Sequence, residues 1–364
     1  MMTKVKKINK DTCSEKDFEE ASQILKDGGL VAFPTETVYG LGGDGLLSSA
    51  AKKIYTAKGR PSDNPLIIHI ADIESLSVLT DDIPEEAKKL ADQFWPGPLT
   101  MVFNKSEKVP YGTTGGLETV AVRMPNHPIA LGLIRNSGVL IAAPSANASG
   151  RPSPTKADHV YEDLNGRIDM IIDGGEVGIG IESTIVDLTS EVPTILRPGF
   201  ITREMLENVI GHVEIDKAIL EKGVKDGLHP KAPGMKYKHY APKGDLTLYE
   251  GEEDAVVEAI NLAVSDKMKL NKKVGVIATD ETKERYHADY VVSIGSRSDE
   301  QSIAQHLYGI LRDFDHLEVE YIYGECFSNV NFGQAIMNRL LKAAGYQVVK
   351  VSDKEGRDKV DELR

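Results

Sequence analysis

Residues 55–70 read YTAKGRPSDNPLIIHI. The stretch joins the end of a helical pattern to a short polar loop and then to an apolar run typical of a strand. Lys58 and Arg60 stand where the helix stops, and two cations on a short connector favour a ligand with several anionic oxygens. Pro61 and Pro65 stiffen the loop, which lowers the ordering cost of binding. The stretch therefore predicts a helix, a strand and a binding loop between them.

The alternation of helix and strand continues on both sides of this stretch. Amphipathic runs that end in glycine or proline predict helices, at residues 17–28, 48–59, 83–97 and 127–138. Apolar runs predict strands, at residues 29–35, 64–72, 98–105, 119–125, 139–147, 167–175 and 182–189. Because helices and strands intermingle, the predicted fold class is α/β.

A change of composition after residue 216 divides the chain. Its 364 residues allow two or three domains at roughly 150 residues each. Residues 217–244 are basic, are punctuated by proline and glycine and lack apolar periodicity, so we interpret them as a linker. They would join a first domain, residues 1–216, to a second, residues 245–364. The second domain starts afresh with alternating strands and helices, which predicts a smaller Rossmann-like α/β unit.

The charge of the chain restricts the kinds of partner. A net charge of −13 argues against broad attraction to nucleic acid or to a membrane surface, although a local basic groove is compatible with it. Residues 1–240 carry 27 basic and 33 acidic side chains, and the remaining 124 residues carry 16 and 23. The second domain is thus more acidic per residue and is the poorer candidate for binding a polyanion.

Cysteine content and hydropathy bear on the compartment. Two cysteines, Cys13 and Cys326, are too few for a disulfide framework or a zinc knuckle, and we interpret both as free thiols in a reducing compartment. No apolar run approaches the ~20 residues that a membrane helix needs. The N-terminal run MMTKVKKINKD has no apolar signal core. We therefore expect a cytoplasmic protein that does not associate with membranes.

Two short motifs suggest other enzymes, and both are incomplete. GLGGDG at residues 40–45 fits the G-x-G-x-x-G of dinucleotide-binding proteins, which would indicate a nicotinamide-dependent oxidoreductase. However, Pro34 breaks the strand before it and Asp72 comes late for the required acidic residue, so a glycine-rich turn close to a ligand is the alternative. S-x-x-K and S-D-N occur at Ser49 and Ser62, without the K-T-G that penicillin-recognising enzymes need.

Polar residues elsewhere stand at the ends of predicted strands or inside them. Residues 143–155, APSANASGRPSPT, follow a buried strand and are either a binding rim or a serine-rich turn. Asn64 can donate to a phosphate or read a base, and His69 in LIIHI is either a core histidine or a ligand contact. Arg123 in the apolar run TVAVRMP must be paired, either by a ligand carboxylate or by an acid of the protein.

Six segments, taken in their order and spacing, resemble one family. They are FPTETVYGLG, YTAKGRPSDNPLIIHI, APSANASGRPSPT, ESTIVDL, LRPG and APGMKYKHYAP. Together they are similar to threonylcarbamoyl-AMP synthases in the two-domain form, with a YrdC-like catalytic domain, a linker and a small C-terminal domain. The resemblance covers nearly the whole chain and implies a twisted, mostly open α/β sheet whose concave face holds the active site. Ala232 stands where serine is common in the family.

The resemblance implies an activity and a set of site residues. The enzyme would join L-threonine, bicarbonate and ATP into threonylcarbamoyl-AMP and release pyrophosphate. The residues that would carry catalysis are Lys58, Arg60, Ser145 and Asn147, with Asn147 ordering the loop or the phosphates. The residues that would bind ATP are Arg60, Asn64, Thr119, Ser145, Ser153, Arg197 and His239. The residues that would bind threonine are Thr37, His69, Arg123, Ser183 and the backbone at Ala143.

The resemblance also implies a cofactor and partners. Mg²⁺ would be held mainly by the triphosphate, and we assign it no protein ligand. No side chain would act as a covalent nucleophile. A partner transferase would pass the threonylcarbamoyl group to an adenosine beside the tRNA anticodon, and a weak contact with tRNA itself is a further implication. The rival interpretation is an RNA-binding module without catalysis, since the face of YrdC-like domains has been associated with RNA.

The linker segment KAPGMKYKHYAP, residues 231–242, predicts a lid over the active site. A solvated spacer would be richer in serine, glycine and acidic residues, and would not expose aromatic rings to water. Lys236 and Lys238 suit a closed site that contains phosphates. We expect His239 to reach ATP and Tyr240 to pack beside it, so that water is excluded from a labile mixed anhydride.

Overall fold

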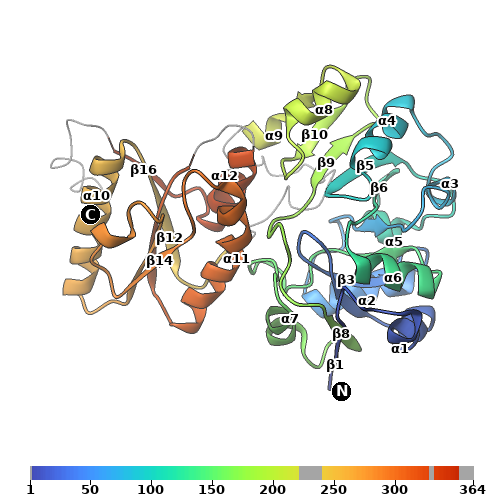
Figure 1. The fold of residues 1–364 in the computed structure, drawn as a ribbon, viewed down its shortest axis with the longest axis horizontal. Coiled ribbons are helices and arrows are strands. Elements are labelled where there is room, and N and C mark those ends of the chain that lie inside the picture. The colour runs from blue at the N-terminus through green and yellow to red at the C-terminus, as the bar shows by residue number, and fades with distance from the viewer. Residues whose placement is uncertain (1, 221–239, 328–331, 352–364) are drawn as a thin grey trace. The chain divides into compact units, whose positions relative to one another are not determined.

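The structure, a computed structural model, describes residues 2–220, 240–327 and 332–351 (Figure 1). By the contacts between its Cα atoms the chain divides into two compact units. Unit 1 comprises Met1–Ser149 and Ser153–Tyr237, and unit 2 comprises Gly150–Pro152 and Lys238–Arg364. Residues 221–239 of the predicted linker, with His239 among them, lie outside the described residues.

Unit 1 is built on one large sheet in which parallel and antiparallel strands are mixed. The eleven strands that the structure describes there follow one another across the sheet in this order: β1 (Lys4–Lys7), β8 (Met170–Asp173), β2 (Val31–Pro34), β3 (Tyr39–Asp44), β7 (Ile141–Ala142), β4 (Ile67–His69), β6 (Thr119–Arg123), β5 (Leu99–Asn104), β9 (Thr184–Asp187), β10 (Thr194–Arg197) and β11 (Glu214–Ile215). More than half of the adjacent strand pairs are not consecutive in the sequence, so the sheet brings distant segments together.

Helices cover this sheet, as Figure 1 shows. Their bounds are α1 (Glu15–Lys26), α2 (Ser48–Lys58), α3 (Leu76–Leu79), α4 (Glu85–Phe94), α5 (Tyr111–Thr114), α6 (Pro128–Ser137), α7 (Ala157–Leu164), α8 (Arg203–Ile210) and α9 (Lys217–Leu220). The four helices predicted for this unit are present, each within a few residues of its expected ends. α2 stops because Gly59 takes a left-handed conformation, φ +62°, and the Arg60 amide then donates to the Tyr55 carbonyl at 2.9 Å.

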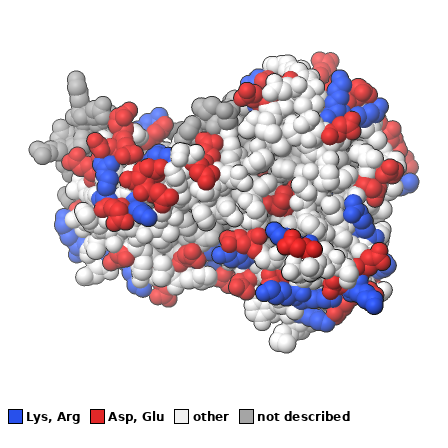
Figure 2. All heavy atoms as spheres, viewed as in Figure 1, with Lys and Arg blue, Asp and Glu red and all other residues white. Residues whose placement is uncertain are grey.

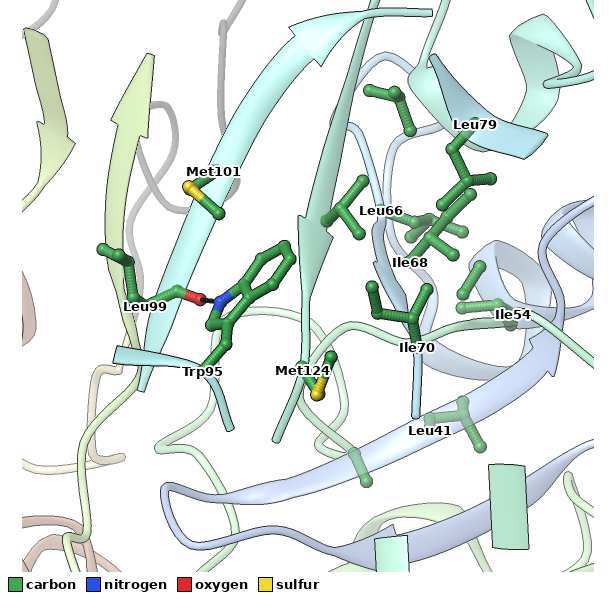
Figure 3. Close-up of a cluster of buried hydrophobic side chains, with 14 of the residues drawn as sticks. Leu41, Ile54, Leu66, Ile68, Ile70, Leu79, Trp95, Leu99, Met101 and Met124 are labelled. Atoms are coloured by element: carbon green, nitrogen blue, oxygen red, sulfur yellow. Dashed lines mark hydrogen bonds between the residues drawn. The ribbon is translucent and has the colours of Figure 1, made fainter. Parts of the chain in front are cut away.

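One face of the sheet packs into a continuous apolar core. Figure 3 shows part of it, where Leu66, Ile68 and Ile70 meet side chains from several other elements. Trp95 closes one side, and its indole nitrogen donates to the Leu99 carbonyl at 2.7 Å. Each such aliphatic side chain stabilises the fold by roughly 1.5–3 kcal/mol relative to exposure. Because alternate side chains of a strand point to opposite faces, the residues between these core positions face the other side of the sheet.

The glycine-rich segment at residues 40–45 corrects the expectation of a turn. Tyr39–Asp44 form strand β3, which pairs antiparallel with β2 and with β7. The glycines allow close packing here: a Cβ on Gly42 would lie 2.7 Å from Ile141 Cγ2 and 2.8 Å from a Phe33 ring carbon. Since a dinucleotide fingerprint is a turn that opens a helix, the oxidoreductase interpretation is also wrong for this segment.

Unit 2 is a smaller parallel α/β unit, as predicted. Its described strands follow the order β14 (Tyr290–Ser293), β13 (Val274–Ala278), β15 (Tyr321–Glu325), β12 (Asp245–Glu250) and β16 (Val348–Lys350). Its helical segments are α10 (Glu253–Lys269), η1 (Lys283–Arg285), α11 (Glu300–His316) and α12 (Phe332–Ala343). The strand pairs described in this sheet are all parallel.

The surface and the thiols agree with the sequence. Figure 2 shows acidic and basic side chains interspersed over the visible face of each unit, in keeping with a moderate negative charge rather than a broad basic surface. Cys13 and Cys326 are both free, as predicted. Within the part of the chain that the structure describes, every helix is too short or too polar to cross a membrane.

Candidate active site

The directions of three strands bring the two predicted binding loops together. β7 pairs antiparallel with β4, in the register Ile68 opposite Ala142. The end of β7 therefore meets the start of β4. The loop that follows β7 contains Ser145 and Asn147, and the loop that precedes β4 contains the residues after Lys58. The sequence placed the first loop correctly after a strand, but its rim argument assumed parallel neighbours, whereas both neighbours of β7 are antiparallel.

Lys58 is a buried cation held by the loop that follows β7. Its side chain lies at the end of α2 and the residue is 3% exposed. Its ammonium group donates to the carbonyls of Ser145 and Asn147, at 2.5 Å each, and lies 3.4 Å from Asn147 Oδ1. The Ser145 hydroxyl donates to the same Oδ1 at 2.6 Å. Three of the four residues predicted to be catalytic thus form one hydrogen-bonded group, which we call the lysine group.

Arg60 and Asn64 shape their own loop. Arg60 Nη2 donates to the Asn64 carbonyl at 3.2 Å and to the Pro65 carbonyl at 3.1 Å, and Tyr55 also donates to the Asn64 carbonyl. Asn64 is 1% exposed, and its Oδ1 accepts no hydrogen bond from any described residue. A buried amide oxygen without a donor indicates a place for a ligand donor, because such atoms are normally satisfied. Arg60 therefore also stabilises its own loop, a role that its position in the sequence did not predict.

A cavity of about 750 Å³ lies beside this loop. Its lining includes Lys52, Tyr55, Arg60 and Tyr111. Among the described residues, Arg60 is the one predicted site residue in that lining. The hydrogen-bonded groups of the site lie elsewhere, so we place the candidate site by its contacts and charges rather than by this cavity.

Arg123 lies at the centre of a second group. β4 and β6 are parallel, which puts His69 beside Arg123, and Arg123 is 4% exposed. Its Nη1 donates to Thr37 Oγ1 at 2.9 Å and its Nε to the Gly97 carbonyl at 3.3 Å. Its Nη2 lies 2.8 Å from Glu36 Oε2. The sequence left open whether a ligand or a protein acid pairs with this arginine, and the structure supplies a protein acid. We call these side chains the arginine group.

Ser183 and Arg197 extend the arginine group along the sheet. Arg197 Nε donates to the Ser183 carbonyl at 2.9 Å and Nη2 to the Ser183 hydroxyl at 3.1 Å. The same hydroxyl lies 2.8 Å from Thr100 Oγ1, and Thr100 is opposite Arg123 in the pairing of β5 with β6. Ser183 is 1% and Arg197 5% exposed. Two arginines and three hydroxyl groups therefore lie within one stretch of adjoining strands.

His69 is neutral in this environment. Burial, and then the charge of Arg123, lower its pKa to about 3. Its Nδ1 lies 3.2 Å from the Ile67 carbonyl, which also accepts from the Ala143 amide at 2.8 Å. His69 and the Ala143 backbone thus approach the same point of β4. An uncharged imidazole can hydrogen-bond to a hydroxyl group without adding charge to the site.

Thr119 lies at the opposite end of β6 from Arg123. Because side chains alternate along a strand, Thr119, Ala121 and Arg123 share one face. Between the two polar ends lies a small apolar cluster of five buried side chains: Ile67, Val102, Ala121, Ile185 and Leu196. Apolar side chains between polar ends are the kind of lining that suits a planar base.

Ser153 lies outside both groups and contacts Glu182. It is fully buried, and its hydroxyl donates to Glu182 Oε1 at 2.5 Å. The sequence did not single out Glu182, Glu36 or Thr100. The two glutamates directly precede Ser183 and Thr37, so adjacency to a predicted residue was the available signal, whereas Thr100 in an apolar strand gave none.

Tyr240 packs within unit 2, with its ring centroid 5.2 Å from that of Tyr308.

The fold and these contacts define a YrdC-like α/β protein whose site can hold anions beside a polar side-chain pocket. The chain belongs to the threonylcarbamoyl-AMP synthase family. A family model of Sua5, YciO and YrdC proteins, described as telomere recombination, matches residues 23–199. A second model, described as the C-terminal domain of threonylcarbamoyl-AMP synthase, matches residues 201–345. The resemblance seen in the sequence is thus confirmed.

Relatives and solved structures support this membership over most of the chain. A threonylcarbamoyl-AMP synthase of Bacillus subtilis is 49% identical over 338 residues, which cover 93% of this chain and 95% of the relative. One of Pyrococcus abyssi is 52% identical over 331 residues, which cover 91% and 95%. The structure of Pyrococcus abyssi Sua5 complexed with L-threonine is 50% identical, with a TM-score of 0.90, and the match covers 96% of this chain and all of that one.

Proposed function

We propose that this chain joins L-threonine, bicarbonate and ATP into threonylcarbamoyl-AMP and pyrophosphate. The observation that carries the proposal is the presence of both groups in unit 1, one on the strands of its sheet and one in the loop that follows β7. The arginine group offers a buried cation, a neutral imidazole and hydroxyls to an amino acid. The lysine group holds the neighbouring loop in place for a nucleotide. Family membership supports the same reaction, because the relatives are named for this product.

The proposed chemistry has two steps. In the first, the amine of threonine forms a bond to the carbon of bicarbonate, and water leaves to give a carbamate. In the second, a carbamate oxygen attacks the α-phosphorus of ATP, and the bond to the β-phosphate oxygen breaks to release pyrophosphate. The site must hold anion next to anion, so fixed positive charge aligns the reactants and stabilises the charge that develops.

We assign the ATP end to the loops around the lysine group. Lys58 is occupied by backbone carbonyls, so its role is to fix the loop that presents Ser145 and Asn147. The unsatisfied Oδ1 of Asn64 would accept from an amino group of the base, which favours base reading over phosphate contact. Arg60 and Arg197 would meet phosphate oxygens.

We assign the threonine end to the arginine group. Arg123 would bind the carboxylate of threonine, and Thr37, His69 and Ser183 would surround its side chain, with Ala143 contributing backbone. Their burial supports this role, because such a pocket excludes water from the reacting groups.

Mg²⁺ would arrive with the triphosphate. Within the described residues no three His, Cys, Asp or Glu side chains gather as a metal centre. We propose that the ion is bound mainly through phosphate oxygens, where it would neutralise charge on the leaving pyrophosphate.

We propose one protein partner on the same basis. The product is a mixed anhydride that hydrolyses readily, so a transferase must consume it promptly. We infer that this transferase modifies a tRNA adenosine next to the anticodon, and that the reaction takes place in a reducing compartment, which two free thiols suit.

Pyrophosphate release tests the function. The purified chain is given ATP and Mg²⁺ with threonine, with bicarbonate, with both and with neither. We expect release only when both are present, with threonylcarbamoyl-AMP detected by mass spectrometry. Release without threonine would contradict the proposed reaction. No release under any condition, while RNA is bound, would favour the RNA-binding module instead.

A further inference from the structure

Glu36 is a buried carboxylate at the threonine end, and the residue roles proposed above assign it no function. It stands in the loop between β2 and β3, directly before Thr37. Its side chain is 13% exposed, and its Oε2 lies 2.8 Å from Arg123 Nη2, whose own side chain is 5% exposed. The loop is anchored, because the Glu36 and Thr37 carbonyls accept from the Ile179 and Gly180 amides at 2.8 and 3.1 Å. The backbone that carries this carboxylate is therefore held in place.

The hydrogen-bonding capacity of this carboxylate is unused. Both oxygens are shielded from solvent, and neither accepts a hydrogen bond from a described residue. The contact with Arg123 Nη2 is close, but the N–H group does not point at the oxygen, and Nη2 itself is without a hydrogen-bond partner. The ion pair with Arg123 compensates the charge of the carboxylate. The hydrogen bonds that Glu36 could accept and that Arg123 Nη2 could donate are nevertheless not made. Buried polar atoms of this kind are normally satisfied, so a ligand with both a donor and an acceptor is indicated.

An α-amino acid has that combination. Its carboxylate and its ammonium group are attached to the same carbon, so the groups that recognise them must also lie side by side. Arg123 and Glu36 are a cation and an anion at 2.8 Å. We propose that Glu36 binds the α-amino group of threonine while Arg123 binds its carboxylate, and that Glu36 accepts the proton that this amino group must lose. The proposal rests on the proposed function of the arginine group.

The proton balance of the reaction needs such an acceptor. Threonine arrives as an ammonium ion, whose nitrogen has no lone pair with which to attack carbon. One N–H bond breaks, and its proton passes to a carboxylate oxygen of Glu36. The freed lone pair forms the bond to the carbon of bicarbonate, and a second amine proton leaves in the water that departs. One proton is thus left over in each turnover, and it resides on Glu36 until solvent removes it.

The other titratable groups around Glu36 do not compete for this role. Arg123 on β6 is permanently charged. His69 on β4 has a pKa lowered to about 3, by burial and by Arg123. His127, which caps α6, has a pKa lowered to about 4, chiefly by burial, although the charge of Glu36 raises it in part. Both imidazoles already accept or share hydrogen bonds with backbone groups. Among these four groups, Glu36 alone is a carboxyl group.

A purely structural counter-ion to Arg123 is the competing explanation, and a pair of ligands separates the two. Threonine is compared with 2,3-dihydroxybutyrate of matching configuration, which carries a hydroxyl in place of the ammonium group. Binding of each is measured by calorimetry at pH 7, in the wild-type chain and in Glu36→Gln. The control variant is Glu176→Gln, which removes an exposed glutamate that pairs with Lys156 at 3.4 Å.

We expect the wild-type chain and the control to prefer threonine over the hydroxy acid by about 10- to 100-fold, as for a lost hydrogen bond to a charged group. In Glu36→Gln that preference should nearly vanish, with threonine weakened and the hydroxy acid little changed. Equal weakening of both ligands would show that Glu36 acts only through Arg123, and would overturn the proposal. An unaltered preference would overturn it as well. Glu36→Asp, which keeps the charge, should restore part of the preference.

The pH dependence of turnover gives a second readout. In Glu36→Gln the deficit in kcat/KM for threonine should shrink as pH rises from 7 to 9, because more of the free amino acid is then already neutral. A deficit that is constant with pH would contradict the role in proton transfer. If the wild-type chain makes no threonylcarbamoyl-AMP, the proposed function fails, yet the binding comparison still decides whether Glu36 reads the amino group.

Discussion

Lys58, at the end of α2, and Arg123, at the end of β6, are both buried cations of unit 1, yet their surroundings differ. Lys58 donates to the Ser145 and Asn147 carbonyls, whereas Arg123 faces the carboxylate of Glu36 and the hydroxyl of Thr37. Partial charges of the backbone compensate the first cation, and a full negative charge compensates the second. Such partners respond differently to mutation, because a stranded carbonyl can bind water while a stranded buried carboxylate must be neutralised or exposed. The lysine group is thus mainly a loop clamp, and the arginine group is a charge-balanced pocket.

Substrate discrimination tests the pocket character of the arginine group and has the largest expected effect. The hydroxyls of Thr37 and Ser183 and the imidazole of His69 surround the proposed threonine side chain. A site built around a hydroxyl group rejects the analogue that lacks it by about 10⁴-fold in kcat/KM, but one that lacks only a methyl by about 10- to 200-fold. We therefore expect 2-aminobutyrate to be far poorer than serine. Comparable kcat/KM values for 2-aminobutyrate and threonine would break the assignment.

Removal of each cation tests the comparison directly. Arg123→Met leaves the Glu36 carboxylate unpaired and should lower the free energy of unfolding by about 3–5 kcal/mol. Lys58→Met strands carbonyls and should cost less, about 1.5–3 kcal/mol. Urea unfolding followed by the fluorescence of Trp95, the single tryptophan, reports unit 1. Arg123→Met combined with Glu36→Gln should recover much of the loss. Equal costs for the two single variants, or no recovery, would remove the distinction.

Arg60 tests the phosphate end by activity rather than stability. Arg60→Ala should lower kcat by about 10²-fold, as for one lost charge-assisted contact in the transition state. Because Arg60 also donates to the Asn64 and Pro65 carbonyls, we expect a small accompanying loss of stability. Arg203→Ala, which removes an exposed arginine of α8, is the matched control. Near-wild-type turnover at saturating ATP would remove Arg60 from the phosphate end.

His69 gives the smallest effect, and it is seen only in acid. Its folded pKa of about 3 lies below the usual value near 6.5, so between these values the unfolded chain binds a proton that the folded chain does not. Stability should therefore fall as pH falls through this window, by up to about 1.4 kcal/mol per pH unit from this residue. His69→Gln should flatten that slope in urea unfolding from pH 7 to 5, leaving the share of His127. Identical slopes would contradict the assignment.

Local patterns predicted the elements well where side chains alternate in polarity. The helix, loop and strand of residues 55–70 were found in place, since a glycine stop and an apolar run act over a few residues. Strand β3 was missed because its glycines carry no pattern, and their reason lies in contacts with Phe33 and Ile141. The lysine-rich β1 was missed as well, because its pairing with β8 joins residues far apart in the chain.

The sequence named the residues of the candidate site, whose roles stay predictions, but it did not predict which of them contact one another. The family resemblance pointed to Arg123, yet its partner Glu36 lies in another loop, and only the fold joins them. The same holds for the contact between Ser153 and Glu182. Partners across a sheet are chosen by strand order, which hydrophobic periodicity does not encode. The predicted ATP contact of His239 lies outside the described residues and stays a prediction.

The order of strands in unit 1 also has a consequence for a chain that is still being synthesised. β4 leaves the ribosome early, but its neighbour β7 follows more than seventy residues later, and β9 and β10 later still. Closing such long segments is slow and costs chain entropy. A nascent chain that ends before Arg197 has therefore emerged still lacks part of the arginine group. Threonine and ATP can stabilise the folded state only of chains that extend at least to Arg197. Products of premature termination before that residue therefore gain no stabilisation from the substrates.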